Sequence, residues 1–272
     1  MKKFDNIIIV SDMDGTFFGD KATLVQRNID AINYFKENGG RITFSTGRVH
    51  YNITYAGNGL EKLCNCPAIC ANGACIYDFE SGNVLREVYM NVDDVVRAIK
   101  IACEESPTTG ERCSTPYGFI THSLTGLIEK DIAHFRGGRV EQRPLDDWKG
   151  EKLLKLVFRD EAEPLLHLRK FLAEKLGDIF TYASSSPRFF EITAKGCSKA
   201  DGIAFLRGLY PDATVYAVGD YENDLEMLSA ADISACPANA MDYVKERADL
   251  SLCDCNEGAI AHLISIIESK LS

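Results

Sequence analysis

The first pattern along the chain is an unbroken apolar run, Ile7 to Val10, which is followed by Ser11 and two acidic residues. A short run of this kind is typical of a strand buried on both faces, as in the middle of a parallel sheet. Asp12 and Asp14 have one residue between them, so in a nearly extended chain both carboxylates point to the same side. Gly15 then allows a turn that a side chain would obstruct.

Helical and extended patterns alternate after this strand. Residues 23–38 carry apolar residues three or four positions apart and end at Gly39-Gly40, which predicts an amphipathic helix with a glycine stop. Residues 41–44 predict the next strand, and residues 45–48 predict the loop that leaves it. A strand, helix and strand in this order imply a right-handed parallel crossover, which brings both loops to one edge of the sheet. Thr46 is therefore expected near Asp12.

The pattern changes between about residues 86 and 190, after a predicted hairpin at Asn72-Gly73. Helical segments (93–103, 164–176) alternate there with extended ones (117–121, 153–158, 189–192). The first pattern then resumes, with a helix at 198–209, a strand at 214–218, an acidic loop at 219–224 and further elements at 233–236, 250–252 and 258–270. We predict an α/β fold with a Rossmann-like parallel-sheet core, helices on both faces and an inserted α+β cap domain. The core would comprise residues 1–85 and 191–272, and the cap residues 86–190.

Composition narrows the classes of partner. The chain has 272 residues, 46% of them hydrophobic and 26% charged, with a formal net charge of -10. Nucleic acids and anionic membranes favour basic surfaces, so neither is an expected partner. The apolar run near the N-terminus is too short for a signal peptide, and no run approaches the roughly 18 apolar residues of a membrane span. We therefore expect a cytoplasmic protein whose ten cysteines are reduced thiols. The oligomeric state is left open.

Four acidic residues lie where predicted core strands end, namely Asp12, Asp14, Asp220 and Asp224. In a parallel sheet they converge on one edge, and carboxylate oxygens at this density favour Mg²⁺. The same topology brings Thr46 to this edge, and Lys199 is a further candidate. A carboxylate nucleophile, a hydroxyl, an amine and a hard cation are the groups that phosphoryl transfer requires.

Four ordered motifs resemble those of the haloacid dehalogenase (HAD) superfamily. They are Asp12-Met13-Asp14-Gly15-Thr16, Ser45-Thr46-Gly47-Arg48, Lys199 in Gly196-Cys197-Ser198-Lys199, and Gly219-Asp220 with Asn223-Asp224. The long insert, Asn72-Gly73-Ala74 and Phe190-Glu191-Ile192 resemble its Cof-type branch of sugar-phosphate phosphatases, which carry a large α/β cap. Two departures concern the pocket rim and the C-terminal region: Tyr221 and Glu222 replace the usual small residue, and Glu257 stands where Asp is common.

The resemblance implies a role for each motif residue. Asp12 would attack phosphorus and become an aspartyl phosphate, and Asp14 would protonate the leaving oxygen and then activate water. Thr46, Gly47 and Lys199 would bind the phosphoryl group. A Mg²⁺ ion would be held by the Asp12 carboxylate, the Asp14 backbone carbonyl and Asp220, with support from Asp224. Asn223 would orient Lys199 or the phosphate. Arg48 is open between a site role and a helix-surface role.

These features predict a Mg²⁺-dependent phosphatase of small phosphorylated metabolites, with a cap that selects the leaving group. One alternative is a phosphomannomutase-like phosphotransferase, which a bisphosphate activator requirement would reveal. Another is a non-catalytic regulator that binds metal or phosphate, against which the second acid, Asp14, argues. The candidates for substrate contact in the cap are Arg136, Arg139, Arg143 and Arg188. The substrate itself is not indicated, because the fold hosts many.

Overall fold

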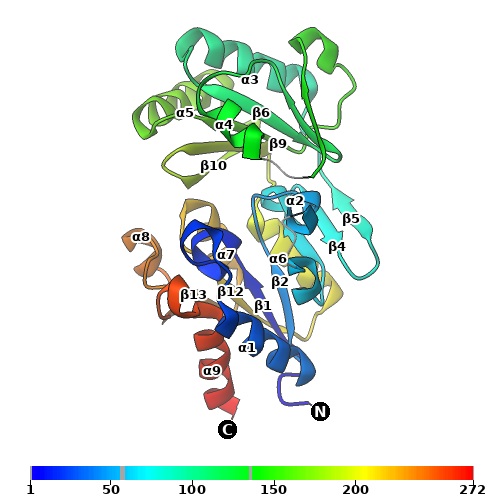
Figure 1. The fold of residues 1–272 in the computed structure, drawn as a ribbon, viewed down its shortest axis with the longest axis vertical. Coiled ribbons are helices and arrows are strands. Elements are labelled where there is room, and N and C mark those ends of the chain that lie inside the picture. Colours follow the sequence, from blue (N-terminus) through cyan, green and yellow to red (C-terminus); the bar gives the residue numbers. More distant parts are fainter. Residues whose placement is uncertain (1, 56–58, 135–136, 272) are drawn as a thin grey trace.

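The computed structural model describes residues 2–55, 59–134 and 137–271. Two bodies lie one above the other along the longest axis, and both chain ends lie in the lower body (Figure 1). The lower body, which we call the core, contains a parallel sheet, and the upper body, which we call the cap, contains a mixed sheet. The predicted fold class, a parallel α/β core with an inserted α+β unit, is confirmed.

The core sheet has the strand order β14-β13-β12-β1-β2, and all neighbouring strands in it run parallel. β1 lies between β12 and β2 and is buried along its whole length. Since the carboxyl ends of parallel strands meet at one edge, the loops that follow β1, β2 and β12 share a single rim. The strands span Ile7–Ser11 (β1), Arg41–Phe44 (β2), Thr214–Val218 (β12), Ile233–Cys236 (β13) and Leu250–Ser251 (β14).

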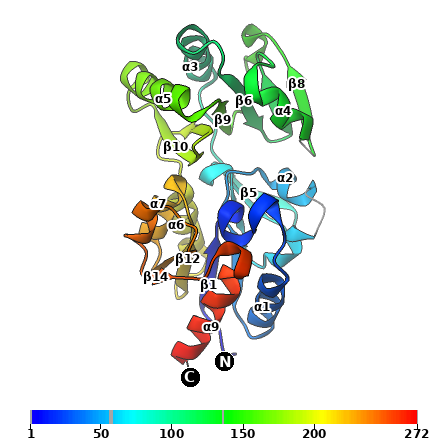
Figure 2. The ribbon, with the colours of Figure 1, turned by 60° about the vertical axis from the view of Figure 1, so that its left-hand side comes forward.

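Both faces of β1 are covered by helices. Ile7 and Ile9 join an apolar cluster that includes residues of α1 (Gln26–Glu37) and α9 (Ala259–Leu271). Ile8 and Val10 join a second cluster with α6 (Lys199–Leu209) and α7 (Leu225–Ala230). Figure 2 shows these two helix pairs on opposite sides of β1. The unbroken apolar run is therefore explained by burial on both faces, as predicted.

Helix α1 begins at Gln26 rather than at the predicted Thr23. Thr23 is still extended and forms an antiparallel bridge with Gly19, so the chain enters the helix later than its apolar spacing suggested. Two further helices, α2 (His50–Tyr55) and α8 (Asp242–Lys245), are short. In the part of the chain that the structure describes, no helix combines the length and the apolar character needed to cross a membrane.

A small antiparallel sheet lies beside the core sheet and contains β3 (Ala68–Cys70), β4 (Cys75–Asp78) and β5 (Asn83–Glu87). The predicted turn joins β3 to β4, with Asn72 and Gly73 at φ of 54° and 92°. A Cβ on Gly73 would lie 2.0 Å from the carbonyl oxygen of Ser198. The turn thus packs against the start of α6, which places Asn72 near the rim of the core sheet.

The cap sheet has the order β10-β11-β9-β6-β7-β8. One of its faces packs on α3 (Val92–Glu105) and α5 (Ala162–Leu176), and α4 (Gly126–His134) follows β7. Figure 1 shows this sheet between those helices and the core. The strands span Gly110–Thr115 (β6), Gly118–Thr121 (β7), Arg139–Gln142 (β8), Lys155–Arg159 (β9), Phe180–Ser186 (β10) and Phe189–Ala194 (β11).

The expected domain boundaries fall inside strands of this structure. The first, between residues 85 and 86, lies within β5, and the second, between residues 190 and 191, lies within β11. β11 pairs with β9 and β10 over most of its length, so it belongs to the cap sheet as far as Ile192 and beyond. Apolar runs alone do not reveal which sheet a strand joins, because pairing is set by tertiary contacts.

Candidate active site

Asp12 and Asp14 follow β1 at the rim of the core sheet. The backbone N–H of Asp12 donates to the carbonyl of Val218 at 2.8 Å, which ties the end of β1 to the end of β12. Gly15 has a φ of 85°, a left-handed conformation that favours glycine. A Cβ at this position would lie 2.6 Å from Oδ2 of Asp220, so glycine is also required for the close approach of the two loops.

Lys199 lies at the centre of the site. Its Nζ donates to Oδ1 of Asp12 and to Oδ1 of Asp224, each at 2.6 Å, and its side chain is fully buried. A capping box at Ser198 and Asp201 fixes the start of α6, from which Lys199 projects. Burial lowers the pKa of Lys199, but the two carboxylates outweigh burial and raise it overall, so its ammonium group stays charged.

Burial sets the electrostatics of the acidic residues. It raises the pKa of Asp12 well above the ordinary value, against the opposing effect of Lys199, and the nearby acids add to the rise. Burial likewise raises the pKa of Asp220 to about 7, with Asp224 as the next contribution. Asp220 also accepts a hydrogen bond from Oγ1 of Thr16 at 2.8 Å. Three carboxylates close together in a buried place are stable in their ionised forms only beside positive charge.

The donor set fits a hard divalent cation. One carboxylate oxygen from each of Asp12, Asp220 and Asp224 can be chosen so that all three atoms lie within 4.8 Å of one another. Oxygen ligands of this kind are those that Mg²⁺ prefers. Asp224 already has hydrogen-bond donors, because its Oδ2 accepts from the backbone N–H groups of Asp220 and Tyr221. Asp224 is therefore better placed to hold Lys199 and this loop than to face an ion directly.

Asp14 points elsewhere. Its carboxylate accepts two hydrogen bonds from Arg48, from Nε at 2.9 Å and from Nη2 at 2.6 Å. The Asp14 side chain is 57% exposed, so it stands at the mouth of the site and not among the buried acids. The role as a metal ligand that we expected for Asp14 concerns its backbone carbonyl and stays a prediction. Of the two readings of Arg48, the contact with Asp14 favours the site role.

The predicted phosphate-binding residues converge on the same cavity. The backbone N–H of Thr46 donates to the Ile69 carbonyl at 2.8 Å, and Thr46 is buried. Asn223 reaches Oδ1 of Asn72 with its amide nitrogen at 3.5 Å. The cavity has a volume of about 810 Å³, within the range of small-molecule sites. Its core-side lining comprises Asp12, Asp14, Thr46, Gly47, Arg48, Asn52, Asp220, Tyr221 and Asn223.

The cap closes the other side of the cavity with a buried ion pair that the sequence did not reveal. Nζ of Lys155 donates to Oε1 of Glu191 at 2.7 Å, and both side chains are about 5% exposed or less. Lys155 also donates to the Gly47 carbonyl at 2.7 Å, and Asn72 donates to Oε2 of Glu191 at 2.6 Å. Two cap residues thus bond to the loops of the core that follow β2 and β3.

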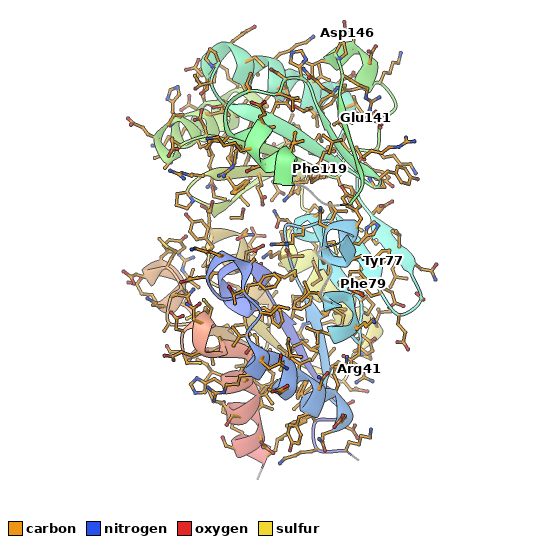
Figure 3. The ribbon with its side chains drawn as sticks, in the orientation of Figure 1. Arg41, Tyr77, Phe79, Phe119, Glu141 and Asp146 are labelled. Carbon is orange, nitrogen blue, oxygen red and sulfur yellow. The ribbon has the colours of Figure 1, made fainter. Side chains whose placement is uncertain are left out.

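Strand alternation places these cap residues. Apolar side chains such as Phe190 and Ile192 pack under the cap helices, so Glu191 between them faces the cavity. Polar residues at alternate positions of these strands were the signal that sequence reasoning missed. The cap-side lining comprises Arg112, Ser114, Phe119, Lys130, Asp131, Lys155, Ser185, Ser186, Phe189 and Glu191. Figure 3 shows Phe119 at the edge of the cap nearest the core, while Asp146 lies at its far end.

The arginines suggested as substrate contacts lie elsewhere. Arg139 is 81% exposed and lies near Glu141, Arg143 pairs with Glu151, and Arg188 pairs with Glu161. None of these three lines the cavity, and Arg136 lies outside the described residues. A further cap residue, Arg169, pairs with Glu222 of the core at 2.6 Å.

The chain is similar to known proteins over most of its length. A family model described as haloacid dehalogenase-like hydrolase matches residues 9–264. YxeH of Bacillus subtilis (strain 168) is 27% identical over 268 residues, which cover 94% of this chain and 96% of that protein. The pyridoxal phosphate phosphatase YbhA of Escherichia coli (strain K12) is 26% identical, over 94% of this chain and 97% of that protein.

A solved structure shows the same fold. It is a haloacid dehalogenase-like hydrolase from Bacteroides thetaiotaomicron, which matches with a TM-score of 0.82 at 23% identity. The match covers 97% of this chain and 100% of that chain. Both bodies and their relative placement are therefore shared with a protein of different sequence.

Proposed function

This chain belongs to the haloacid dehalogenase-like hydrolase family, in its Cof-type branch, and is a phosphatase of phosphorylated metabolites; we propose that it works through a phosphorylated aspartate. The family resemblance inferred from the four motifs is thereby confirmed. The observation that carries the proposed mechanism is the contact of Lys199 with both Asp12 and Asp224 in a buried site beside Asp220.

Asp12 is the proposed nucleophile. Its Oδ1 accepts from Lys199, which leaves Oδ2 to attack phosphorus. The bond to the leaving oxygen breaks as the bond to Oδ2 forms, and water then attacks phosphorus to release phosphate and restore the carboxylate. Lys199, Thr46 and Gly47 would bind the phosphoryl oxygens, because their positive charge and hydrogen-bond donors oppose the charge of the transferring group.

Asp14 is the proposed general acid and base. To protonate the leaving oxygen it needs a protonated carboxyl, which cannot keep its two-bond contact with Arg48. An incoming phosphate is an anion that Arg48 can bind instead. We therefore propose that substrate binding draws Arg48 away from Asp14 and so prepares the acid for its first step.

We propose Mg²⁺ as the metal, held by Asp12, the Asp14 carbonyl and Asp220, with Asp224 in support. When bound, the cation would neutralise phosphate charge and stabilise the ionised acids. We also propose that residues from about 92 to 194 act as one cap unit, since α3 begins and β11 ends at these positions. A cytoplasmic location and the lack of affinity for nucleic acid remain predictions.

A panel of phosphomonoesters, assayed for phosphate release with Mg²⁺ and with a chelator, tests this function. We expect Asp12→Asn to lower turnover by at least about a thousandfold, because the nucleophile is lost. Asp242→Asn, at an aspartate whose side chain is 94% exposed, should turn over at the normal rate. Release by the Asp12→Asn protein at the wild-type rate would overturn the mechanism.

A further inference from the structure

Two polar residues of β6 face the cavity from the cap. Arg112 and Ser114 are two positions apart on one face of the strand, and Cys113 between them packs in the apolar cluster of the cap. In the sheet register Arg112 lies opposite Val157 of β9, which in turn lies opposite Glu191 of β11. Arg112 and Glu191 thus stand in one row across the cap sheet.

The Arg112 guanidinium has unused hydrogen-bond donors. It lies over the Phe119 ring, 4.2 Å from the ring centre, and among the described residues no oxygen accepts a hydrogen bond from it. Burial lowers its pKa, while Glu191 and Asp131 oppose that effect. These two acids already have partners, since Lys155 pairs with Glu191 and Arg159 with Asp131. Within this group of five charged side chains, the charge of Arg112 is not balanced.

Ser114 provides a second and independent observation. It is 1% exposed, it lines the cavity, and in the described structure its Oγ has no hydrogen-bond partner. Buried hydroxyl groups are almost always hydrogen-bonded, because leaving one unpaired costs about 1–3 kcal/mol. A buried hydroxyl and an unbalanced guanidinium at neighbouring positions are the groups that a bound anion would satisfy together.

The position of these residues sets the length of a ligand. β6 is two strands away from β11, which corresponds to about 10 Å between the strands. Glu191 marks the other end, where it accepts a hydrogen bond from Asn72 beside the proposed phosphate-binding loop. Lys155 of β9 lies opposite Ser114, between the two ends, and reaches the Gly47 carbonyl. A molecule with an anionic group at each end of a chain of about six carbons spans this distance.

We propose that Arg112 and Ser114 form a second anion-binding subsite, which selects phosphorylated substrates that carry a carboxylate or a further phosphate at the end distant from Asp12. This inference rests on the proposed function, because it assigns the substrate class of the same cavity. The aromatic face of Phe119 holds the guanidinium plane in position for a two-bond contact with the anion.

A matched pair of substrates tests the subsite. 6-Phosphogluconate and sorbitol 6-phosphate differ only in a terminal carboxylate that replaces a CH₂OH group. We expect wild-type kcat/KM to favour 6-phosphogluconate by about tenfold to a hundredfold. Arg112→Gln should lower this ratio by at least about tenfold, mainly through KM, and Ser114→Ala by a few fold. The control Arg139→Gln, at a cap arginine 81% exposed, should leave the ratio unchanged.

A second pair, glucose 1,6-bisphosphate and glucose 6-phosphate, distinguishes a phosphate from a carboxylate as the distant group. The subsite is supported if Arg112→Gln lowers the preference within either pair. It is overturned if the variant lowers kcat/KM equally for both members of each pair, or if wild type shows no preference in either. Should Arg112→Gln fail to fold, Arg112→Lys, which keeps the charge but not the two-bond geometry, replaces it.

Binding separates this inference from the mechanism. In the Asp12→Asn background with Mg²⁺, calorimetry would compare the Kd values of the same pairs with and without Arg112→Gln. A preference for the doubly anionic ligand that disappears with Arg112 supports the subsite even if the wild type releases no phosphate, which would refute only the proposed function. Equal Kd values within both pairs in the presence of Arg112 would refute the subsite.

Discussion

The core and the cap build the same cavity from different parts of their strands. In the core, the functional side chains follow the ends of parallel strands, and most of those nearest the reaction are acids. In the cap, several of them stand within strands, on the sheet face opposite α3 and α5, and include Arg112, Ser114 and Glu191. Strand ends can move with their loops, whereas a strand face is held by its neighbours on both sides. The core is therefore suited to chemistry and the cap to recognition.

This contrast implies that changes in the core should abolish turnover, whereas changes in the cap should alter affinity, selectivity or stability. A core variant with a purely structural effect, or a cap variant that abolishes turnover without affecting binding, would break the comparison.

The largest effect is expected from Lys199→Met. Without the ammonium group, the buried carboxylates of Asp12 and Asp224 lose their shared partner. We expect kcat to fall by at least about a hundredfold and the free energy of unfolding by about 3–5 kcal/mol. Phosphate release and denaturant unfolding measure the two effects. Lys195→Met is the control, because this lysine is 63% exposed and pairs at the surface; equal behaviour of the two variants would contradict the assignment.

Gly15→Ala should weaken metal binding. The new Cβ would lie 2.6 Å from Oδ2 of Asp220 and force that carboxylate to move. We expect the Mg²⁺ concentration for half-maximal activity to rise about tenfold or more. Gly150→Ala is a matched control, since Gly150 has the same φ of 85° but no atom within 4 Å of the added Cβ. Its cost should be limited to about 1 kcal/mol of backbone strain, and an equal loss of metal affinity in both variants would count against the contact with Asp220.

Lys155→Met sharpens the comparison from the cap side. It leaves Glu191 buried without its partner and removes the bond to the Gly47 carbonyl. We expect KM to rise about tenfold and the cap to lose several kcal/mol of stability. The double variant Lys155→Met with Glu191→Leu should recover much of the stability, because no unpaired charge remains, but not the KM. Recovery of both in steady-state kinetics and melting would show that the pair has no role in positioning.

The smallest effect concerns pH and lies wholly within the cap. Burial raises the pKa of Glu111 to about 7. The stability linked to its protonated form is complete below the unfolded pKa near 4.5 and is lost as the pH rises through 7. Wild type should therefore lose up to about 3 kcal/mol between pH 4.5 and 8 that Glu111→Gln does not lose. Unfolding at both pH values measures the difference, and parallel pH profiles would exclude it.

The sequence predicted the core better than the cap for a physical reason. Asp12, Asp220 and their neighbours follow apolar runs, and parallel strands bring such ends together whatever the details of packing. The hydrogen bonds from Arg48 to Asp14 were less accessible, because they depend on how the chain turns at Gly15.

The cap resisted prediction because β6 gives a weak strand signal. Its sequence, Gly110–Thr115, is mostly polar, and only its pairing with β9 and β7 makes it a central strand. Whether Arg112 faces the cavity or solvent depends on that pairing and on which face the helices cover. Arg139 and Arg188 were chosen by charge alone, and both lie in surface ion pairs instead.

The buried pair of Lys155 and Glu191 lies entirely within the cap, whereas Arg169 and Glu222 belong to different bodies. If the two bodies swing apart to admit a ligand, the buried ions move together, and water replaces their contacts with the Gly47 carbonyl and the Asn72 amide. The partly exposed ions of Arg169 and Glu222 do separate, and dissolved salt screens their attraction. Higher ionic strength should therefore make opening easier by weakening the pair of Arg169 and Glu222. The pair of Lys155 and Glu191 stays intact on opening, so salt should not affect it.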